Sequence, residues 1–578
     1  MTTDKFYDYI ICGGGTSGCV LAGRLAENLN VQILLIEAGP DSADLENVHM
    51  VGGWSNNFDS ETDWNIETEP QAGADNRQIR CSRGRFLGGS SGVNGTLCIR
   101  GIKQDFDDWQ LDGWSGDDMW RCMNKSETIH GKSWFTPSVK DHGYDGPLHV
   151  EPHDLAPISE SVKESMIEQG LPLHEDMFAT GETSTGCGHV LRTVYQGTRS
   201  TAADFVTKEY RRNNITIQTD ATVDRVILTE ELGGLRATGV EMVTKSGEKV
   251  IARARKEVIV SAGAYGSPAI LLRSGIGPED ELEKVGVTPK VHLPGVGKNL
   301  LDHPVCWFFY EVNKPGLTND HLIHHDNGYA SAYQLYKEKK TGILSTFPFG
   351  IFAYTRLDEQ LKGHHLWDKA PRWEGRDPMG LTPSQPNVEF FNTELYGGPK
   401  QWIDFPSDNR YVVGMCTVLF SARSRGSVTL GSPDPMENPA VDHAYLSDPL
   451  DLLVLTQGCQ TINNIMMTGK ATKDIIKGSW PLQRNHHTYT SQEEWVPYVK
   501  ETVTTCYHPG GTCKMGHITD PMAVLDERMR VRGVKGLRVV DVSVMPELNN
   551  GHTQSPAYGI GERAAEIIKE DVKRTYKL

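Results

Sequence analysis

The sequence predicts a mixed α/β fold that opens with a nucleotide-binding unit. An apolar run ends at Cys12, a second apolar run ends at Glu37, and a helical stretch lies between them. The turn before that stretch contains glycines in the spacing G-x-G-x-x-G, at Gly13, Gly15 and Gly18. Strand, glycine turn, helix and strand in this order form the βαβ unit of a Rossmann-like fold. A glycine turn alone would be weak evidence, but within this unit it predicts dinucleotide binding.

Each part of this unit has its own physical role. Gly13 permits the tight turn, Gly15 lets backbone N–H groups approach a pyrophosphate, and Gly18 lets the helix pack closely against the strand. Thr16 and Ser17 lie where the helix begins, and its N-terminus faces the phosphates. The acid that ends the second strand stands 24 residues after the first glycine, where a carboxylate can accept both hydroxyls of an adenosine ribose.

Length and composition indicate a globular enzyme of two domains. The chain of 578 residues is too long for one ordinary core, and 59 glycines with a hydrophobic fraction of 38% fit a loop-rich protein. The formal charge of −17 argues against nucleic-acid binding by bulk charge. No run of about 18 apolar residues occurs, so we expect no transmembrane segment.

Cysteine usage and the two ends of the sequence favour an intracellular protein, most simply a cytoplasmic one. The 11 cysteines are an odd number without a CxxC pair, which is typical of reduced thiols. The first strand begins at Tyr7, which leaves no room for a signal peptide. The final Tyr576-Lys577-Leu578 matches a peroxisomal address poorly, because a tyrosine stands in its first place.

Further elements follow from local patterns. Alternating and apolar runs predict strands over 214–219, 221–228, 237–243 and 249–262, and this meander returns the chain to the nucleotide unit. Four tryptophans in the mixed stretch 102–200 suggest packed surfaces of a second domain: Trp109, Trp114, Trp120 and Trp134.

Proline and glycine positions limit other elements. A proline at its first position and a glycine after its last predict a helix over 268–274. Residues 411–419 and 536–544 are predicted as strands, and 556–571 as a helix with one apolar side.

Two patterns could indicate other chemistry, and we interpret neither in that way. Ser90 stands in a G-x-S-x-G motif, but a hydrolase nucleophile needs a strand before it, and a basic turn precedes Ser90. Adjacent histidine pairs without a ligand cluster predict solvated loops and no metal site: His324–His325, His364–His365 and His486–His487.

Four groups of segments together resemble the glucose–methanol–choline (GMC) oxidoreductases, a family of FAD enzymes. They are the N-terminal glycine unit, the loop 84–94, the stretch 263–277, and the segments 508–512 and 552–556. The match runs in order along nearly the whole chain, and 295–304 extends it. The resemblance implies a Rossmann-like FAD-binding domain interleaved with a substrate-binding domain, the latter built on an antiparallel sheet with helices.

The resemblance also divides the chain. Residues 1–304 would be mostly FAD-binding, with a substrate-domain insertion around 102–200. Residues 305–505 would be mostly substrate-binding. Residues 506–578 would return to the FAD domain and carry the catalytic histidines.

Individual residues acquire roles toward FAD from the same resemblance. The glycines of the first unit would hold the pyrophosphate and Glu37 the adenosine ribose. Val223 would contact adenine through its backbone, and Asp541 would meet the ribityl–phosphate region. Beside the pyrophosphate and the flavin ring would run Arg85, Gly88, Ser91, Asn94 and Gly95. Gln554 and Pro556 would lie at the pyrimidine side, where a helix start favours the negative charge of the reduced ring.

Two positions distinguish this chain within the family. Val93 occupies the place of the histidine to which some members attach FAD, so we expect non-covalent FAD. Cys98 stands where many members carry an aromatic residue or alanine, so the wall that faces the flavin differs from theirs at this position.

Alcohol oxidation by a flavin needs a base for the hydroxyl proton and an acceptor for the hydride. Imidazole has a suitable pKa for the base. The resemblance assigns the base to His508 and its partner to His552, as in the two-histidine members, which include aryl-alcohol oxidases and glucose oxidases and dehydrogenases. His303 is interpreted as structural.

Several alternatives stay open at this point. The substrate would be a small-molecule alcohol, and the electron acceptor either O2 or a quinone-like compound. The same fold could instead oxidise formate or catalyse a lyase or cyclase reaction with FAD, although formate-oxidising relatives carry arginine in the place of His552. An NAD-dependent enzyme or a non-catalytic nucleotide-binding module would require two of the matching segments to be coincidental.

Overall fold

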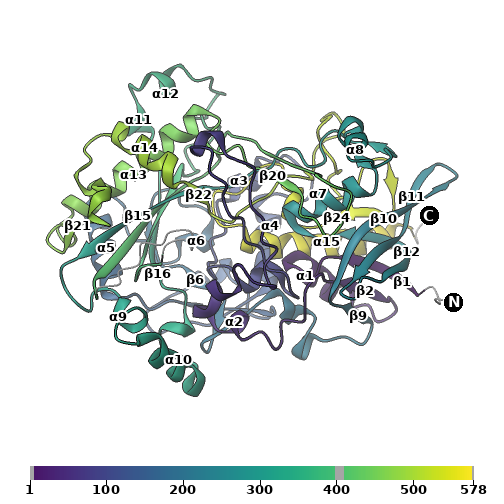
Figure 1. The fold of residues 1–578 in the computed structure, drawn as a ribbon, viewed down its shortest axis with the longest axis horizontal. Helices are drawn as coiled ribbons and strands as arrows, with labels where there is room; N and C mark the ends of the chain where they lie inside the picture. Colours follow the sequence, from purple (N-terminus) through teal and green to yellow (C-terminus); the bar gives the residue numbers. More distant parts are fainter. Residues whose placement is uncertain (1–4, 398–408, 576–578) are drawn as a thin grey trace.

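The computed structural model describes residues 5–397 and 409–575, so the C-terminal tripeptide considered above as a targeting signal lies outside the described residues. Within this part of the chain the two largest sheets have eight and seven strands, and they lie at opposite ends of the molecule (Figure 1). We call the eight-stranded sheet the first sheet and the seven-stranded sheet the second sheet. The mixed α/β fold class predicted from the sequence is confirmed.

The first sheet has a parallel centre in the strand order β12-β1-β2-β9. The long strands β10 and β11 extend it in antiparallel fashion beyond β12, and the short strands β23 and β24 pair with β11 and β12. Strands β1 and β2 at the centre are largely apolar, as expected of parallel strands that are buried on both faces. The strands are β1 (Phe6–Cys12), β2 (Ile33–Ile36), β9 (Ile215–Gln218), β10 (Ala221–Glu231), β11 (Gly234–Thr244), β12 (Lys249–Val260), β23 (Val534–Lys535) and β24 (Leu537–Val539).

The second sheet is antiparallel, in the order β21-β15-β18-β17-β16-β5, with β22 beside β15. Buried side chains of its strands pack against helix α13 (Pro449–Thr468) and helix α5 (Pro157–Glu168). Its strands are β5 (Gly186–Gly188), β15 (Pro304–Val312), β16 (Phe349–Thr355), β17 (Val388–Thr393), β18 (Tyr411–Leu419), β21 (Ile476–Trp480) and β22 (Thr504–Thr505). The strand predicted over 411–419 is confirmed.

Helix α7 (Gly263–Arg273) begins five residues before the predicted start at Pro268, so that prediction was wrong at its N-terminal end. Proline inside a helix leaves the carbonyl four residues earlier without its usual N–H partner. Here the hydroxyl of Thr512 donates to that carbonyl, on Ala264, at 2.6 Å. A distant side chain therefore makes the longer helix possible.

The strand predicted over 536–544 is also only partly correct. It ends after Val539, and residues Val542–Val544 form a 3-10 turn. The carboxylate of Asp541 caps this turn by accepting the N–H of Ser543 at 2.8 Å. Aspartate favours such a cap over a continuing strand.

Three of the four tryptophans expected in a second domain belong instead to the core of the first sheet. Trp109, Trp114 and Trp120 are buried together with residues of β1 and β2. They lie on or beside helices α3 (Lys103–Asp107) and α4 (Gly116–Ser126), and α4 packs against the C-terminal helix α15 (Gln554–Thr575). Trp134 is 41% exposed.

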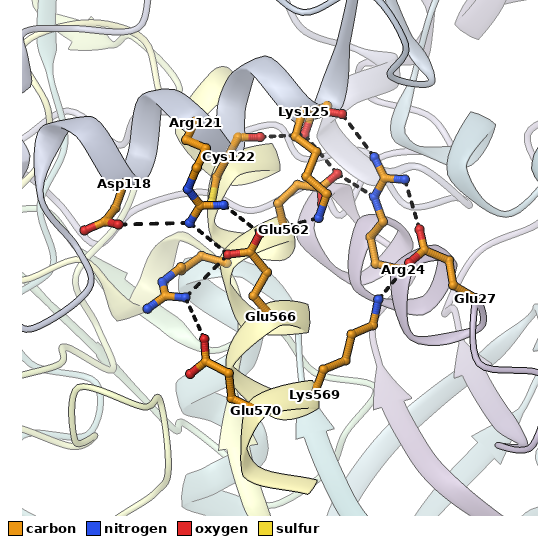
Figure 2. Close-up of polar contacts among 12 residues, drawn as sticks. Arg24, Glu27, Asp118, Arg121, Cys122, Lys125, Glu562, Glu566, Lys569 and Glu570 are labelled. Carbon is orange, nitrogen blue, oxygen red and sulfur yellow. Dashed lines mark hydrogen bonds and ion pairs between the residues drawn. The ribbon is translucent and has the colours of Figure 1, made fainter. Parts of the chain in front are cut away.

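Helix α15 is joined by ion pairs to α1 (Thr16–Leu25) and α4 (Figure 2). The wholly buried carboxylate of Glu562 lies 2.7 Å from Nε of Arg24 and 2.9 Å from Nζ of Lys125. Near the helix starts, the hydroxyl of Ser17 donates to the carbonyl of Ala557 at 2.7 Å. The N-termini of α1 and α15 are thereby held in a fixed relation to each other.

Candidate active site

One elongated cavity collects most of the residues predicted to contact FAD, from the ends of β1 and β2 to the start of α15. The predicted residues that line it are Gly13, Gly15, Thr16, Ser17, Glu37, Ser91, Asn94, Gly95, Val223, Asp541 and Gln554. Both predicted catalytic histidines, His508 and His552, line it as well. The predicted residues that lie behind its wall are Gly18, Arg85, Gly88 and Pro556.

Glycine is required at the nucleotide end for steric reasons. Gly13 has a φ of +114°, and a Cβ there would lie 2.3 Å from the carbonyl oxygen of Ser261. A Cβ on Gly18 would lie 2.1 Å from the carbonyl oxygen of Gly13. Gly18 thus acts through helix packing and not through contact with the cavity, whereas the space beside Gly15 is open. This cradle fits a pyrophosphate at the start of α1.

Glu37 has the geometry expected of a ribose acceptor. Its Oε2 accepts the N–H of Gly14 at 3.0 Å, and its Oε1 accepts the N–H of Gly39 at 2.9 Å. These bonds fix the carboxylate and leave acceptor capacity on both oxygens. Burial raises the pKa of Glu37 to about 7, partly offset by the two backbone N–H groups.

Arg85 and Gly88 shape the cavity from behind. The N–H of Gly88 donates to the carbonyl of Gly14 at 2.7 Å, which joins the small-residue loop to the glycine turn. The guanidinium of Arg85 lies over the ring of Trp64, with 5.4 Å to its centroid, and Trp64 lines the cavity.

Asp541 closes the middle of the cavity. Its Oδ2 accepts the N–H of Gly263 at 3.0 Å and the hydroxyl of Ser267. Burial raises the pKa of this carboxyl above its ordinary value.

Asn94 and Gln554 join the loop to the start of α15. The side-chain amide of Asn94 donates to Oε1 of Gln554, and the amide of Gln554 donates to the carbonyl of Leu97 at 3.2 Å. Val93 lines the cavity next to them with an alkyl side chain.

His508 and His552 lie next to each other at the far end, with ring centroids 4.6 Å apart. Both are more than nine-tenths buried. Burial, followed by the neighbouring His552, His303 and Arg83, lowers the pKa of His508 well below its ordinary value. His508 is therefore a neutral imidazole at pH 7 and can accept a proton.

His303 is in direct contact with this pair, which the structural interpretation of this residue did not include. Its Nδ1 lies 3.0 Å from Nδ1 of His508. Burial lowers the pKa of His303 to about 3. The preceding Asp302 accepts the backbone N–H of His508 at 2.9 Å and the hydroxyl of Thr505 at 2.6 Å. Asp302 thus fixes the backbone that carries His508.

Glu389 is a site residue that sequence reasoning missed. Its Oε1 lies 2.8 Å from Nε2 of His552, and its side chain is wholly buried on β17. A signal was present, because a single acid interrupts the otherwise uncharged strand Val388–Thr393. Buried acids of this kind are rarely tolerated without a partner.

The prediction of solvated histidine pairs was wrong for two of the residues. His486 is wholly buried, and its Nε2 lies 3.0 Å from the carbonyl oxygen of Phe309. His325 is buried, and its Nε2 lies 2.8 Å from the carbonyl oxygen of Arg410. Across residues 5–397 and 409–575 we find no grouping of three or more His, Cys, Asp or Glu side chains that could hold a metal ion. In the same residues, every helix is too short or too polar to cross a membrane.

Comparisons with known proteins agree with this geometry. Two family models described as GMC oxidoreductase match residues 7–305 and 422–561. The chain is 34% identical over 573 residues to the oxygen-dependent choline dehydrogenase of Vibrio vulnificus (98% of this chain, 94% of that protein). It is 32% identical over 595 residues to the glucose dehydrogenase [FAD, quinone] of Drosophila pseudoobscura pseudoobscura (98% and 87%).

Solved structures give the same result. A formate oxidase variant from Aspergillus oryzae RIB40 superposes with a TM-score of 0.90 at 30% identity, covering 99% of this chain and all of that one. Pyridoxine 4-oxidase from Mesorbium loti superposes with a TM-score of 0.79 at 27% identity, covering 97% and 98%. The chain therefore belongs to the GMC oxidoreductases, FAD-binding enzymes that act on CH–OH donors.

Proposed function

We propose that this protein oxidises the CH–OH group of a small-molecule alcohol to a carbonyl, with His508 as the general base and His552 as its partner. The observation that carries the proposal is that two buried, adjacent imidazoles line the same cavity as the glycine cradle for a dinucleotide. Relatives named choline dehydrogenase, glucose dehydrogenase and pyridoxine 4-oxidase support an alcohol substrate.

The residues of the chain divide the reaction between them. Bound FAD would supply the two-electron acceptor for the hydride of the substrate carbon. His508 takes the hydroxyl proton, and since its Nδ1 faces His303, its Nε2 is the nitrogen available to the substrate. His552 binds the same hydroxyl, and the carboxylate of Glu389 fixes the orientation of its ring.

The walls near the histidines favour a substrate with an apolar or aromatic body. Trp54, Phe347, Phe349, Phe391 and Trp307 all line the cavity. Their rings form one continuous cluster, with neighbouring centroids between 4.5 and 5.7 Å apart. Aromatic walls bind flat apolar groups, and they also bind quaternary ammonium groups through cation–π contacts.

An anionic substrate is disfavoured. The carboxylate of Glu389 contacts His552, the residue that we propose binds the substrate, and at this short range it would repel the negative charge of formate. Formate oxidation, the activity for which one group of structural neighbours is named, is therefore the weaker candidate for this chain.

Non-covalent attachment of FAD is part of the proposal. Val93, which stands at the attachment position, has an alkyl side chain that cannot form a bond to the flavin. We expect acid precipitation to release all of the flavin into the supernatant, with none left on the denatured chain.

The experiment that tests the proposal is an anaerobic visible spectrum of the purified protein during stepwise addition of alcohols. Benzyl alcohol, choline, glucose, pyridoxine and formate are added separately, and we expect rapid bleaching with the uncharged aromatic alcohol. Bleaching by choline alone would assign the aromatic walls to cation binding. Readmitted air then decides the acceptor, because rapid reoxidation identifies an oxidase and slow reoxidation a dehydrogenase.

A pair of variants ties the bleaching to the proposed base. H508Q should bleach about 100- to 10,000-fold more slowly, the usual contribution of a general base. His153 is a matched control, because it is a buried histidine that lies 2.9 Å from a buried glutamate, Glu394, outside the cavity. H153Q should bleach at nearly the rate of the unchanged protein. A protein that contains flavin and bleaches with no alcohol would refute the proposal.

A further inference from the structure

Arg199 is a buried cation directly behind the flavin end of the cavity. Its side chain is 1% exposed. Its Nη1 donates to the carbonyl oxygen of Asn94 at 2.7 Å and to Oδ1 of the same residue at 2.9 Å, and its Nε donates to the carbonyl oxygen of Val48 at 3.1 Å. Among the described residues, its Nη2 has no hydrogen-bond partner.

No described carboxylate forms an ion pair with this guanidinium. Three other buried guanidiniums lie beside a carboxylate: Arg100 beside Glu127 at 2.9 Å, Arg273 beside Asp224 at 3.4 Å, and Arg538 beside Glu257 at 2.7 Å. The buried Arg192 resembles Arg199, because it too has no ion pair among the described residues. Its guanidinium, however, donates to the carbonyl oxygen of Phe349 at 2.6 Å and not to Asn94. A buried charge without a counter-ion is costly, so it needs compensation from elsewhere. Burial lowers the pKa of Arg199 to about 9, which still leaves the group charged at pH 7.

The positive charge of Arg199 is linked to the cavity wall through Asn94. Asn94, which Arg199 holds by two oxygens, lines the cavity and donates to Gln554, the first residue of α15. With both Asn94 oxygens accepting from Arg199, the amide nitrogen of Asn94 must point toward Gln554. The N-terminus of α15 contributes positive potential at the same place.

We infer that Arg199 supplies the positive charge that compensates the negative charge gained by the ring of bound FAD on reduction, and that it is a positioning residue for the Asn94–Gln554 hydrogen bonds. The inference rests on the proposed flavin chemistry. The negative charge on the reduced FAD ring would then be the counter-ion of the Arg199 guanidinium, which pairs with no carboxylate among the described residues. Removal of the charge should therefore make reduction less favourable without removing any group that touches the substrate.

Sulfite binding tests this without any alcohol. Sulfite adds to the oxidised ring of FAD, bleaches it and leaves a negative charge on it, so its Kd reports the local potential. In the purified holo-protein we expect R199M and R199Q to raise the sulfite Kd about tenfold or more, the scale expected for the loss of one nearby unit charge. The two-electron midpoint potential should fall by about 30 mV for each tenfold change.

Three variants separate charge from hydrogen bonding. Burial lowers the pKa of a lysine at this position more consequentially than that of arginine, so all variants are compared at a pH low enough to keep the ammonium of R199K charged. There R199K should stay within about threefold of the unchanged protein, whereas R199Q keeps an N–H donor for Asn94 but loses the charge. R538M is the matched control, because it removes a buried guanidinium that already has carboxylate partners and that does not line the cavity. It should leave the sulfite Kd unchanged.

Two results would overturn the inference. One is an unchanged sulfite Kd in both R199M and R199Q. The other is a normal Kd in R199Q with a weakened one in R199K, which would assign Arg199 to hydrogen bonding alone. If R199M retains too little FAD for a titration, the contrast between R199Q and R199K decides. Because sulfite needs no alcohol, failure of the proposed alcohol oxidation would be seen separately, as flavin that binds sulfite but bleaches with no alcohol.

Discussion

Nε2 of His552 lies 2.8 Å from Oε1 of Glu389, a carboxylate that is wholly buried in the second sheet. This contact joins the cavity, which His552 lines, to a strand whose single acid is Glu389. We expect E389Q to lower kcat/KM for the best alcohol about 10- to 100-fold, because the ring of His552 loses the carboxylate that fixes its orientation. Steady-state kinetics with equal flavin content measure the effect.

Glu394 provides the control for E389Q. It is also buried, lies 2.9 Å from a histidine, His153, and belongs to the segment that follows the same strand, but it does not line the cavity. E394Q should lower thermal stability and leave kcat/KM nearly unchanged. Equal kinetic losses in both variants would show that Glu389 acts only through the stability of the sheet.

The pH dependence of kcat/KM should reflect the lowered pKa of His508. Burial and the neighbouring imidazoles favour its neutral form, so the base stays available as the pH falls below the ordinary histidine pKa of 6.5. We expect the acid limb of the kcat/KM profile to lie below pH 6.5. An acid limb at or above that value would show that the cation of His508 is stabilised in the free enzyme, contrary to the described site.

Glu37 should control FAD affinity in a pH-dependent manner. E37Q removes the carboxylate charge that we propose accepts the ribose hydroxyls of FAD, so we expect FAD to bind about 10- to 100-fold more weakly. Because burial raises the pKa of Glu37 to about 7, the carboxylate forms as the pH rises through 7, and affinity in the unchanged protein should increase over the same range. Flavin fluorescence titrations from pH 6 to 8 measure both effects. An equal pH dependence in E37Q would assign it to another group.

Glu562 should contribute to stability through the ion pairs that join α1, α4 and α15 (Figure 2). E562Q leaves Arg24 and Lys125 without their buried counter-charge, and because both cations are partly exposed we expect a loss of about 1–3 kcal/mol. Thermal unfolding of the holo-protein measures it as a lower Tm. Glu566 is more exposed, so E566Q should cost less; an equal or larger loss in E566Q would contradict this ranking.

Local patterns were sufficient to predict the elements whose residues interact mainly with their neighbours in sequence. The βαβ unit, the meander of β9 to β12, strand β18 and the C-terminal helix all follow from periodicity and glycine spacing. The histidines and most of the cofactor residues came from the family resemblance, and the structure places them around one cavity.

What could not be predicted depends on contacts between distant segments. Thr512 donates to Ala264 and so permits α7 to start before its proline, a relation that no local window contains. Glu389 and His552 are 163 residues apart, and their pairing depends on the register of strand β17. This strand lies in residues 305–505, whose sequence shows little periodicity. The buried state of His486 likewise comes from packing against Phe308 and Trp495, not from its own neighbours in sequence.

The cavity wall is assembled from segments that are far apart in the chain, including the glycine turn, residues near Val223, the start of α7, and the start of α15. A molecule that touches all of them acts as a reversible crosslink between these segments, and two of the three loops that it closes, from the glycine turn to Val223 and from the start of α7 to the start of α15, are each more than about 200 residues long. FAD should therefore be a structural component as much as a reagent, and its binding free energy adds to the stability of the fold. A break in the backbone anywhere between Glu37 and Gln554 would place parts of the cavity wall on two separate fragments. Loss of FAD from the protein would therefore indicate that the polypeptide has been cleaved.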